Sequence, residues 1–335
     1  MITVMSNKLR WGVLSTANIG LKKVIPGMQR GQFTTVTAIA SRSLAKAREA
    51  AAALGIAKPY GSYEELLADP DIDAIYNPLP NQLHVPWSIK AAEAGKHVLC
   101  EKPISLDVAE ARTLLAVQQR TGVLIAEGFM VRSHPQWVRA SELIRAGRVG
   151  KLSAIQGVFS YYNTDPRNIR NIPGCGGGSL MDIGCYPIHI SRFLFGEEPV
   201  RVLGLIDQDP KLKVDRLTSA LMEFPSGQSV FTCSTQLVYH QRLQLLGTLG
   251  RIEMVMPFTP PPDLACQILI DDGQSSTTET FSLCNQFTIQ GEVFSRAVRE
   301  GTGVPVPLTD AVKNMAVIEA IFRSAKSGRW ETPVP

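Results

Sequence analysis

The fold is decided by the stretch HVLCEKP, at residues 97–103. Its first four residues form a short, mostly apolar run, which is typical of a buried parallel strand. Glu101 and Lys102 follow at once, and Pro103 ends the strand because its ring fixes φ and removes an N–H donor. We therefore expect Lys102 at the carboxyl end of a strand, the edge where open α/β sheets bind ligands. From this stretch alone, a solvated Glu-Lys loop pair is the more common interpretation, and the rest of the chain has to decide between the two.

Strands and helices alternate on both sides of this stretch, in the order of parallel βαβ units. The alternation predicts a doubly wound, Rossmann-type sheet in the first part of the chain. Its predicted strands are 9–14, 34–40, 74–77, 97–100 and 123–127, and its predicted helices are 44–54, 63–68, 83–94 and 106–121.

The turn after the first strand reads STANIG at residues 15–20, where a dinucleotide-binding fold carries G-x-G-x-x-G. Only the third glycine, Gly20, is present. Ala17 still permits a close approach of the backbone to a phosphate, and Ser15 offers a hydroxyl. We therefore predict that this turn binds the cofactor, with an ordinary strand-turn-helix as the alternative. The candidates are Ser15, Thr16, Ala17, Asn18 and Ile19.

The end of the second strand bears on the choice between NAD and NADP. No Asp or Glu follows it to accept from a ribose 2′-hydroxyl; the sequence is instead Ser41-Arg42-Ser43. An arginine between two small hydroxyl residues suits the 2′-phosphate of NADP. A plain surface position for Arg42 at the start of helix 44–54 is the alternative.

A proline-rich loop, NPLPNQLH at residues 77–84, breaks both the helical and the strand period. It leaves the third predicted strand at the same sheet edge as Lys102, so we place it near the nicotinamide end of a bound dinucleotide. The cofactor-binding candidates from this edge are Pro78, Leu79, Asn81, His84, Glu101 and Lys102.

The second half changes character, because strands follow one another without crossover helices. This order predicts a large, mostly antiparallel, open-faced sheet in an α/β domain. A helix near 180–195 is expected to cover one face, and further helices are predicted at 135–146 and 286–300. We predict domains at 1–128 and 129–335, with a final helix at 309–327 that packs back on the first. The predicted strands are 151–162, 200–207, 216–224, 228–237, 240–247, 250–255 and 265–271.

The candidate functional side chains of the second half are concentrated in the stretch GGGSLMDIGCYPIH, at residues 176–189. Its three glycines permit close approach to a ligand or to another segment. At helical spacing, Asp182, Tyr186 and His189 share one face, which then carries an acid, a phenol and an imidazole. Each residue alone is also common as a packing or helix-terminal side chain.

Composition narrows the functional classes. Apolar residues make up 44% and charged residues 19% of the 335, and the net charge of +4 is not gathered into a basic block. We therefore expect neither nucleic acid nor a membrane as a partner. The amino terminus shows no secretory signal, which predicts a cytoplasmic protein. The six cysteines form no C-x-x-C pair and the five histidines no metal motif, so no metal is expected.

Taken together, these motifs resemble those of the Gfo/Idh/MocA oxidoreductases, over nearly the whole chain. The branch that is most similar contains glucose–fructose oxidoreductase, NADP-dependent xylose dehydrogenases, dihydrodiol dehydrogenases and nucleotide-sugar ketoreductases. The resemblance implies a nicotinamide-binding Rossmann domain and a second domain whose sheet often forms a homodimer or homotetramer. It is carried by the turn at 15–20, PLPNQLH at 78–84, AGKHVLCEKP at 94–103, EGFMVR at 127–132, GGGSLMDIGCYP at 176–187 and FTPPP at 258–262.

The implied reaction is NADP-dependent hydride transfer to or from a carbinol carbon, which requires a group that exchanges the hydroxyl proton. Tyr186 is the candidate: its unperturbed pKa of about 10 is too high for a base near neutrality, but a nearby Lys102 ammonium favours the phenolate. Asp182 completes the catalytic set, and Arg132, Asp182 and His189 are candidates for substrate binding. A sugar, a dihydrodiol and a nucleotide ketosugar stay open as substrates, and a non-catalytic NADP-binding regulator is the alternative of another class.

Overall fold

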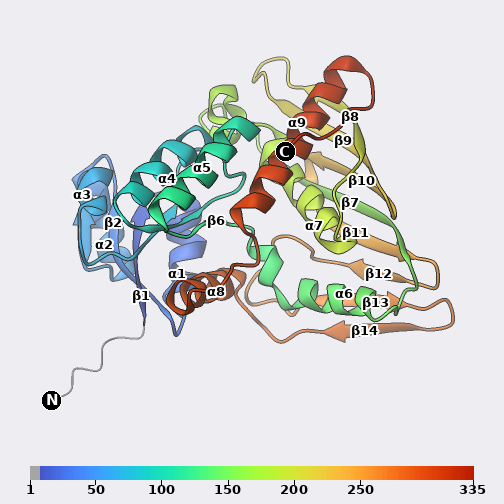
Figure 1. The fold of residues 1–335 in the computed structure, drawn as a ribbon, viewed down its shortest axis with the longest axis horizontal. Coiled ribbons are helices and arrows are strands. Elements are labelled where there is room, and N and C mark those ends of the chain that lie inside the picture. Colours follow the sequence, from blue (N-terminus) through green and yellow to red (C-terminus); the bar gives the residue numbers. More distant parts are fainter. Residues whose placement is uncertain (1–7) are drawn as a thin grey trace. The chain divides into compact units, whose positions relative to one another are not determined.

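The computed structural model describes residues 8–335, so the expected lack of a secretory signal at residues 1–7 lies outside the described part. The chain forms two compact units (Figure 1). The first contains residues 8–104, 110–133 and 285–309. The second contains 105–109, 134–284 and 310–335. The sequence predicted a boundary at 128/129, whereas the structure turns from the first unit to the second at 133/134.

The first unit is built on a six-stranded parallel sheet in the order β3-β2-β1-β4-β5-β6. This is the doubly wound arrangement that the alternating strands and helices predicted, so the fold class is confirmed. In the register of β4 and β5, Asn77 lies opposite Cys100, so both strands end together at one edge. The strands are β1 (Leu9–Leu14), β2 (Thr34–Ala40), β3 (Lys58–Tyr60), β4 (Ala74–Asn77), β5 (His97–Cys100) and β6 (Ile125–Glu127).

The connections of this sheet are helices, apart from short turns at its carboxyl edge. A π-helical turn, Gly20–Val24, leads into α1 (Ile25–Met28), and two 3-10 turns lie at Asn81–Leu83 and Met130–Ser133. The remaining helices are α2 (Leu44–Leu54), α3 (Tyr63–Leu67), α4 (His84–Glu93), α5 (Val108–Thr121) and, from much later in the sequence, α8 (Gln286–Glu300).

Helix α8 belongs to the first unit because it packs on α1 and β1. The Thr288 hydroxyl donates to the carbonyl oxygen of Gly27 at 2.6 Å, and the Trp11 indole N–H donates to the Ser295 hydroxyl at 3.1 Å. A Cβ atom at Gly27 would come within 2.9 Å of the Phe287 Cβ. Glycine at this position therefore permits α8 to approach. Helix α9 (Leu308–Ser327) belongs almost wholly to the second unit, and the expected packing of a final helix on the first domain stays a prediction.

The second unit is built on an eight-stranded sheet in the order β14-β13-β12-β11-β7-β10-β9-β8. Of the neighbouring pairs in this sheet, the inner pair β7 and β10 is parallel and the others are antiparallel, as predicted. The strands are β7 (Leu152–Tyr162), β8 (Arg201–Gln208), β9 (Asp215–Phe224), β10 (Gly227–Ser234), β11 (Gln236–Gly247), β12 (Arg251–Met254), β13 (Gln267–Asp271) and β14 (Ser276–Thr280).

Three helices pack on this sheet. Helix α7 (Cys185–Phe195) lies on β7 and β10, which confirms that the helix near 180–195 covers one face. Helix α9 lies on β8, where a Cβ atom at Gly204 would come within 2.8 Å of the Ile321 carbonyl oxygen. Helix α6 (Pro135–Arg145) is joined to β14 by the fork of Arg139, whose Nε donates to Glu279 at 2.8 Å.

Neither β3 nor β14 was predicted from the sequence. Both are edge strands, so each has one unpaired side and little buried surface. β3 is only three residues long, and β14 reads STTET, without an apolar side chain. The apolar pattern that reveals an inner strand is therefore missing in both.

In residues 8–335, no helix combines the length and the apolar character that crossing a membrane requires. The six cysteines are free thiols. The described residues contain no group of three or more His, Cys, Asp or Glu side chains that is arranged to hold a metal ion.

Candidate active site

The phosphate turn of the first unit takes a glycine-like conformation without a glycine. Ser15 follows β1 and has φ of +80°, in the left-handed region that glycine favours. Its backbone N–H donates to the Ala40 carbonyl at 3.0 Å, and its hydroxyl accepts from the Ala17 N–H at 3.2 Å. Helical backbone begins at Asn18. The turn thus places a helix N-terminus at the carboxyl edge of the sheet, which fits a cradle for a phosphate group.

Arg42 lies at the same edge, after β2. The hydroxyl of Ser41 accepts from the backbone N–H of Ser43 at 3.3 Å and so shapes the turn before α2. The Arg42 side chain is exposed, and its charge acts on the phenol of Tyr63, whose pKa burial raises. Within residues 8–335 no ion pair engages Arg42. The guanidinium is therefore available to a phosphate.

The loop after β4 is held by hydrogen bonds from two uncharged side chains, Asn77 and His84, to backbone carbonyls. Asn77 donates from its amide to the His84 carbonyl at 3.0 Å. The ring nitrogens of His84 lie 2.8 Å from the Pro103 carbonyl oxygen and 2.7 Å from that of Leu79. Burial lowers the pKa of His84 to about 4, so the ring is neutral at pH 7 and its single N–H donates to one of these carbonyls at a time.

This arrangement places His84 between two loops of the protein, whereas the sequence assigned it to the cofactor. The ring ties the loop at 78–83 to the segment that carries Lys102. Pro78 and Leu79 belong to the same loop, and Asn81 opens its 3-10 turn. The role of His84 in cofactor binding stays a prediction; in the structure both of its ring nitrogens face loop carbonyls.

Glu101 and Lys102 follow β5 directly, as the sequence predicted. The backbone N–H of Glu101 donates to the Asn77 carbonyl at 3.1 Å, and its carboxylate accepts from the Tyr76 hydroxyl at 2.6 Å. Tyr76 is fully buried in β4. The Glu101 carboxylate is therefore held from the neighbouring strand, which fixes the backbone that presents Lys102.

In the second unit, Asp182 is the centre of a polar cluster. One carboxylate oxygen accepts from the Tyr161 hydroxyl at 2.6 Å, and the other accepts from Arg170 Nε at 2.9 Å. The Asp182 charge is the main reason why the pKa of Arg170 is raised, while burial and then Asp182 raise the pKa of Tyr161. At neutral pH the cluster therefore holds a guanidinium, a carboxylate and a neutral phenol.

The glycines before Asp182 permit two other segments of the chain, at Arg170 and at Asp215, to approach closely. The Gly178 N–H donates to the Arg170 carbonyl at 2.8 Å, and a Cβ atom at Gly177 would lie 2.6 Å from the same oxygen. At Gly178, where φ is +118°, a Cβ atom would overlap the Asp215 carboxylate. Sequence analysis allowed for a close segment, but it did not identify Arg170. The signal that could have found it is the run itself, since three glycines require a partner backbone.

Tyr186 lies near the start of α7 among aromatic rings. It is only 3% exposed, and the rings of Phe159 and Phe258 lie 5.8 Å and 5.6 Å from its own. Phe258 comes from the loop at 258–262. The aromatic surroundings keep the phenol ring fixed, and π-helical Leu180–Gly184 sets the path from Asp182 to Tyr186.

The structure places the other two predicted substrate-binding residues, His189 and Arg132, in other surroundings than the Asp182 cluster. His189 is 1% exposed, and its Nδ1 lies 3.2 Å from Asp310 of α9. Although burial raises it, the pKa of Asp310 is lowered by His189 and Arg192. Arg132 lines a cavity of about 30 Å³ in the first unit, together with Glu127 and Gln290.

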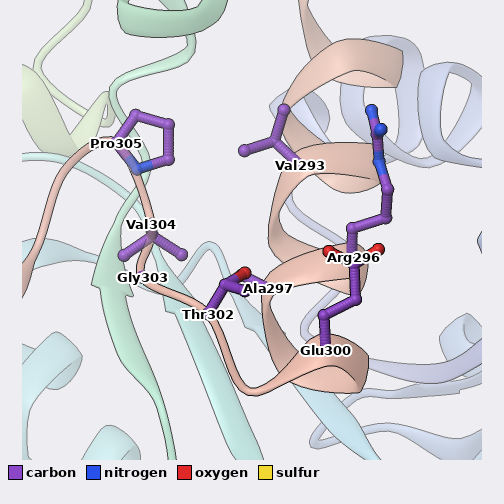
Figure 2. Close-up of a pocket in the computed structure, with 8 residues that line it drawn as sticks. All are labelled: Val293, Arg296, Ala297, Glu300, Thr302, Gly303, Val304 and Pro305. Atoms are coloured by element: carbon purple, nitrogen blue, oxygen red, sulfur yellow. The ribbon is translucent and has the colours of Figure 1, made fainter.

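A larger, open pocket of about 530 Å³ lies in the first unit between α8 and the segment that follows it (Figure 2). Val293, Arg296, Ala297 and Glu300 line it from α8. Thr302, Gly303, Val304 and Pro305 line the other side. None of the predicted site residues belongs to this pocket.

Comparisons with known proteins match both parts of the chain. Residues 9–129 match the model of an oxidoreductase family with an NAD-binding Rossmann fold, Gfo/Idh/MocA, and residues 137–253 match the Gfo/Idh/MocA C-terminal domain. An uncharacterised oxidoreductase of Rhizobium meliloti is 46% identical, over 97% of this chain and 99% of that protein.

Two further relatives carry named activities. D-xylose 1-dehydrogenase (NADP(+)) 2 of Haloferax volcanii is 37% identical, over 96% of this chain and 98% of that enzyme. The crystal structure of KijD10, a 3-ketoreductase from Actinomadura kijaniata in complex with NADP and TDP-benzene, is 29% identical with a TM-score of 0.89. That match covers 95% of this chain and 98% of that one.

Proposed function

The chain belongs to the Gfo/Idh/MocA family of oxidoreductases, and from this premise we propose that it is an NADP-dependent dehydrogenase or reductase of sugars. The proposed reaction moves a hydride between the nicotinamide and a carbinol or carbonyl carbon of a sugar or related polyhydroxy compound, as an aldose 1-dehydrogenase does. The 37% identity to a D-xylose 1-dehydrogenase that uses NADP supports this choice.

The carboxyl edge of the first unit fits NADP. Ser15 forms the turn that a phosphate requires, and the helix from Asn18 offers its N–H groups. Arg42 would hold the 2′-phosphate, with Ser41 and Ser43 beside it. NADP, when bound, supplies the carbon that accepts or donates the hydride.

The protein's own part is to move a proton. Tyr186 would take the proton of the substrate hydroxyl in oxidation and return it in reduction. Lys102 would favour the phenolate and stabilise negative charge on the reacting oxygen. Asp182 would hold the position of the groups around Tyr186, in keeping with its contacts to Tyr161 and Arg170.

The observation that carries the proposal is the Asp182 cluster one turn before a buried tyrosine. Packing alone does not need a phenol, a carboxylate and a guanidinium at one place, because burying polar groups is costly. The cluster therefore favours a chemical role for Tyr186.

The test is Tyr186→Phe, which removes only the hydroxyl. We expect kcat to fall by roughly 10² to 10⁴, the usual contribution of a positioned acid or base, with NADP affinity within a few-fold of the wild type. Steady-state kinetics with D-xylose and other aldoses measure kcat, and fluorescence titration measures NADP binding.

Tyr162→Phe is the matched control, since Tyr162 is 69% exposed at the end of β7. It should leave kcat and NADP affinity unchanged. Turnover of Tyr186→Phe that equals that of this control would remove the proton-transfer role.

A nucleotide-sugar ketoreductase is the second candidate, favoured by the structural similarity to the 3-ketoreductase crystallised with TDP-benzene. Oxidation of trans-dihydrodiols uses the same proton transfer and belongs in the same screen. Absorbance of reduced nicotinamide separates the three: aldoses or dihydrodiols with NADP⁺ should produce it, and a nucleotide ketosugar should consume NADPH.

We also propose that the sheet of the second unit forms a homodimer or homotetramer. Large apolar side chains are exposed along it, with Val238 at 80%, Leu205 at 76% and Tyr239 at 55%. Val238 and Tyr239 are neighbours on β11 and Leu205 lies on the edge strand β8, so exposed apolar side chains occur at two places on the sheet, and such side chains are commonly covered in oligomers. Sedimentation equilibrium measures the mass, and a monomer at micromolar concentration would contradict the proposal.

A further inference from the structure

The backbone of Arg170, in the loop between β7 and α7, is held from both sides. Its N–H donates to the side chain of Asn168 at 3.1 Å, and its carbonyl accepts from Gly178 at 2.8 Å. The neighbouring Asn171 is buried and donates to the Asp165 carbonyl at 2.9 Å. The loop and the glycine run together determine where the Arg170 side chain begins.

The Arg170 side chain is fixed as well. Its Nε donates to Asp182 at 2.9 Å, and Asp182 cannot turn away because Tyr161 holds its other oxygen at 2.6 Å. Phe159 and Tyr161 point to the same side of β7; Tyr186 packs on the first ring at 5.8 Å, and Asp182 accepts from the second at 2.6 Å. Tyr186 therefore lies beside the ion pair, and its negative charge, when it ionises, favours the Arg170 guanidinium. Interaction between two charges is mutual, so the guanidinium stabilises an ionised Tyr186 to the same degree.

Because Asp182 is negatively charged, Tyr186 needs a nearby positive charge in order to ionise. The Asp182 carboxylate, 11% exposed and one turn before Tyr186, would on its own disfavour a second negative charge on the phenol. The ion pair with Arg170 offsets that carboxylate. Three further titratable groups lie beside the cluster. Burial keeps the thiol of Cys233 on β10 protonated by raising its pKa, and the thiol of Cys185 donates to the Asp182 carbonyl at 3.5 Å. The Asp215 carboxylate accepts from the Ser179 hydroxyl and the Leu180 N–H at 2.7 Å.

We propose that Arg170 is a positioning residue for Tyr186: its guanidinium, held by Asp182, offsets the carboxylate and so permits the Tyr186 hydroxyl to ionise. The proposal rests on the proposed function, in which that hydroxyl exchanges the substrate proton. It assigns to the second unit a cation of its own beside the acid-base group, in addition to Lys102, which stays unchanged in all the variants below.

The experiment titrates Tyr186 in the full-length protein without substrate. Phenolate absorbance near 295 nm is recorded against pH, and the same curve for a matching Tyr186→Phe protein is subtracted, which isolates this one tyrosine. The set is wild type, Arg170→Met, Arg170→Lys, the double variant Arg170→Met with Asp182→Asn, and Arg167→Met. Arg167 is the matched control, since it lies three residues earlier and 90% exposed.

Arg170→Met should raise the midpoint of Tyr186 ionisation by about one to two pH units, the usual effect of losing a nearby opposite charge. Arg170→Lys should recover most of this shift because it keeps the charge. The double variant should return the midpoint close to that of the wild type, since it also removes the carboxylate. A merely structural loss would not be reversed by a second substitution in the same cluster.

An unchanged midpoint in Arg170→Met, or a shift that the double variant leaves in place, overturns the proposal. Near-ultraviolet circular dichroism identifies a misfolded variant, and Arg170→Lys then carries the test. The proposed function fails separately: if Tyr186→Phe keeps its turnover while Arg170→Met shifts the titration, Arg170 controls the ionisation of a tyrosine that the reaction does not use.

Discussion

Two lysines flank the same strand, β5, and the protein uses them in opposite ways. Lys96 precedes the strand, is 7% exposed and donates to the carbonyls of Asp69 at 2.7 Å and Ile72 at 2.8 Å. Lys102 follows the strand at the edge where the turn at Ser15 and the loop at 77–84 also lie. The two ends of one strand thus belong to two different surfaces.

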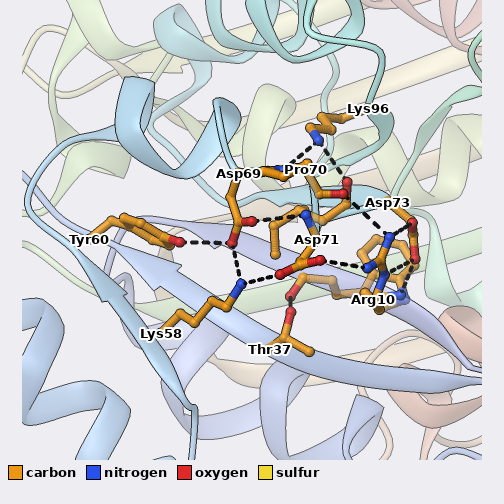
Figure 3. A network of polar contacts seen from close by, with 11 residues as sticks. Arg10, Thr37, Lys58, Tyr60, Asp69, Pro70, Asp71, Asp73 and Lys96 are labelled. Carbon is orange, nitrogen blue, oxygen red and sulfur yellow. Dashed lines mark hydrogen bonds and ion pairs between the residues drawn. The ribbon is translucent and has the colours of Figure 1, made fainter. Parts of the chain in front are cut away.

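The surface around Lys96 is a closed network of charges (Figure 3). Arg10 binds Asp73 at 2.7 Å, and Lys58 binds Asp69 at 2.9 Å and Asp71 at 2.8 Å. Each of these charges is satisfied by another element of the same unit, so the network joins the starts of the strands. At the carboxyl edge, by contrast, Asn77 and His84 fasten loop backbones through neutral groups. The comparison indicates that one edge stabilises the sheet and the other is shaped for a ligand.

The largest expected effect is at the carboxyl edge. Lys102→Met should lower kcat by roughly 10² to 10³, the usual loss when one donor to a reacting oxygen is removed, and should leave the unfolding free energy nearly unchanged. Steady-state kinetics and urea denaturation measure the two quantities on the same preparation. If Lys102→Met instead lowered the free energy of unfolding by several kcal/mol, the loss of activity would be explained by a loss of folded protein and not by a catalytic role of Lys102.

Lys96→Met tests the opposite end of β5. Two buried carbonyls lose a charged donor, so we expect the unfolding free energy of the first unit to fall by about 2 to 3 kcal/mol. The kcat and KM of the protein that remains folded should match the wild type. Urea denaturation followed by tryptophan fluorescence reports both units, through the buried Trp11 of the first and the buried Trp137 of the second, and the transition of the first unit should shift. If Lys96→Met lowered kcat while the free energy of unfolding stayed at the wild-type value, the proposed division into a stabilising edge and a ligand-binding edge would be wrong.

Arg42→Ala sharpens the comparison within the carboxyl edge. Charge-assisted hydrogen bonds contribute roughly 1.5 to 3 kcal/mol, so the dissociation constant of NADP should rise about 10- to 100-fold while that of NAD barely changes. Titration calorimetry with both cofactors measures the ratio. Equal losses for NADP and NAD would exclude contact with the 2′-phosphate.

How far the sequence predicted these features depends on how local their causes are. The strand before Lys102 and the helix-covered sheet follow from apolar runs and turn residues, which act over a few positions. The edge strands β3 and β14 were not predicted, because a strand that is paired on one side only does not need an apolar pattern. Arg170 escaped because its position depends on the Gly178 backbone and on Asp182, which lie 8 and 12 residues further on.

Helical spacing was also an incomplete guide to Asp182, Tyr186 and His189. The spacing assumed a regular α-helix, whereas Leu180–Gly184 is π-helical and adds a residue to its turn. His189 then lies against Asp310 of α9, a partner more than a hundred residues away. No local pattern could have indicated that contact.

The smallest expected effect concerns the conformation of Ser15 and separates backbone shape from side-chain chemistry at the carboxyl edge. Left-handed backbone costs a serine about 1 kcal/mol, which Ser15→Gly removes. Against this stand the greater freedom of glycine in the unfolded chain and the lost contact with the Ala17 N–H, each about 1 kcal/mol or less.

These opposing terms leave Ser15→Gly within about 1 kcal/mol of wild-type stability and within a few-fold of its NADP affinity. Ser15→Val cannot adopt φ of +80° without strain of about 1 to 3 kcal/mol, so its NADP affinity should fall roughly tenfold or more. Calorimetric titration of both variants decides the matter. If glycine weakened NADP binding as much as valine does, the hydroxyl rather than the shape of the turn would be what the phosphate requires.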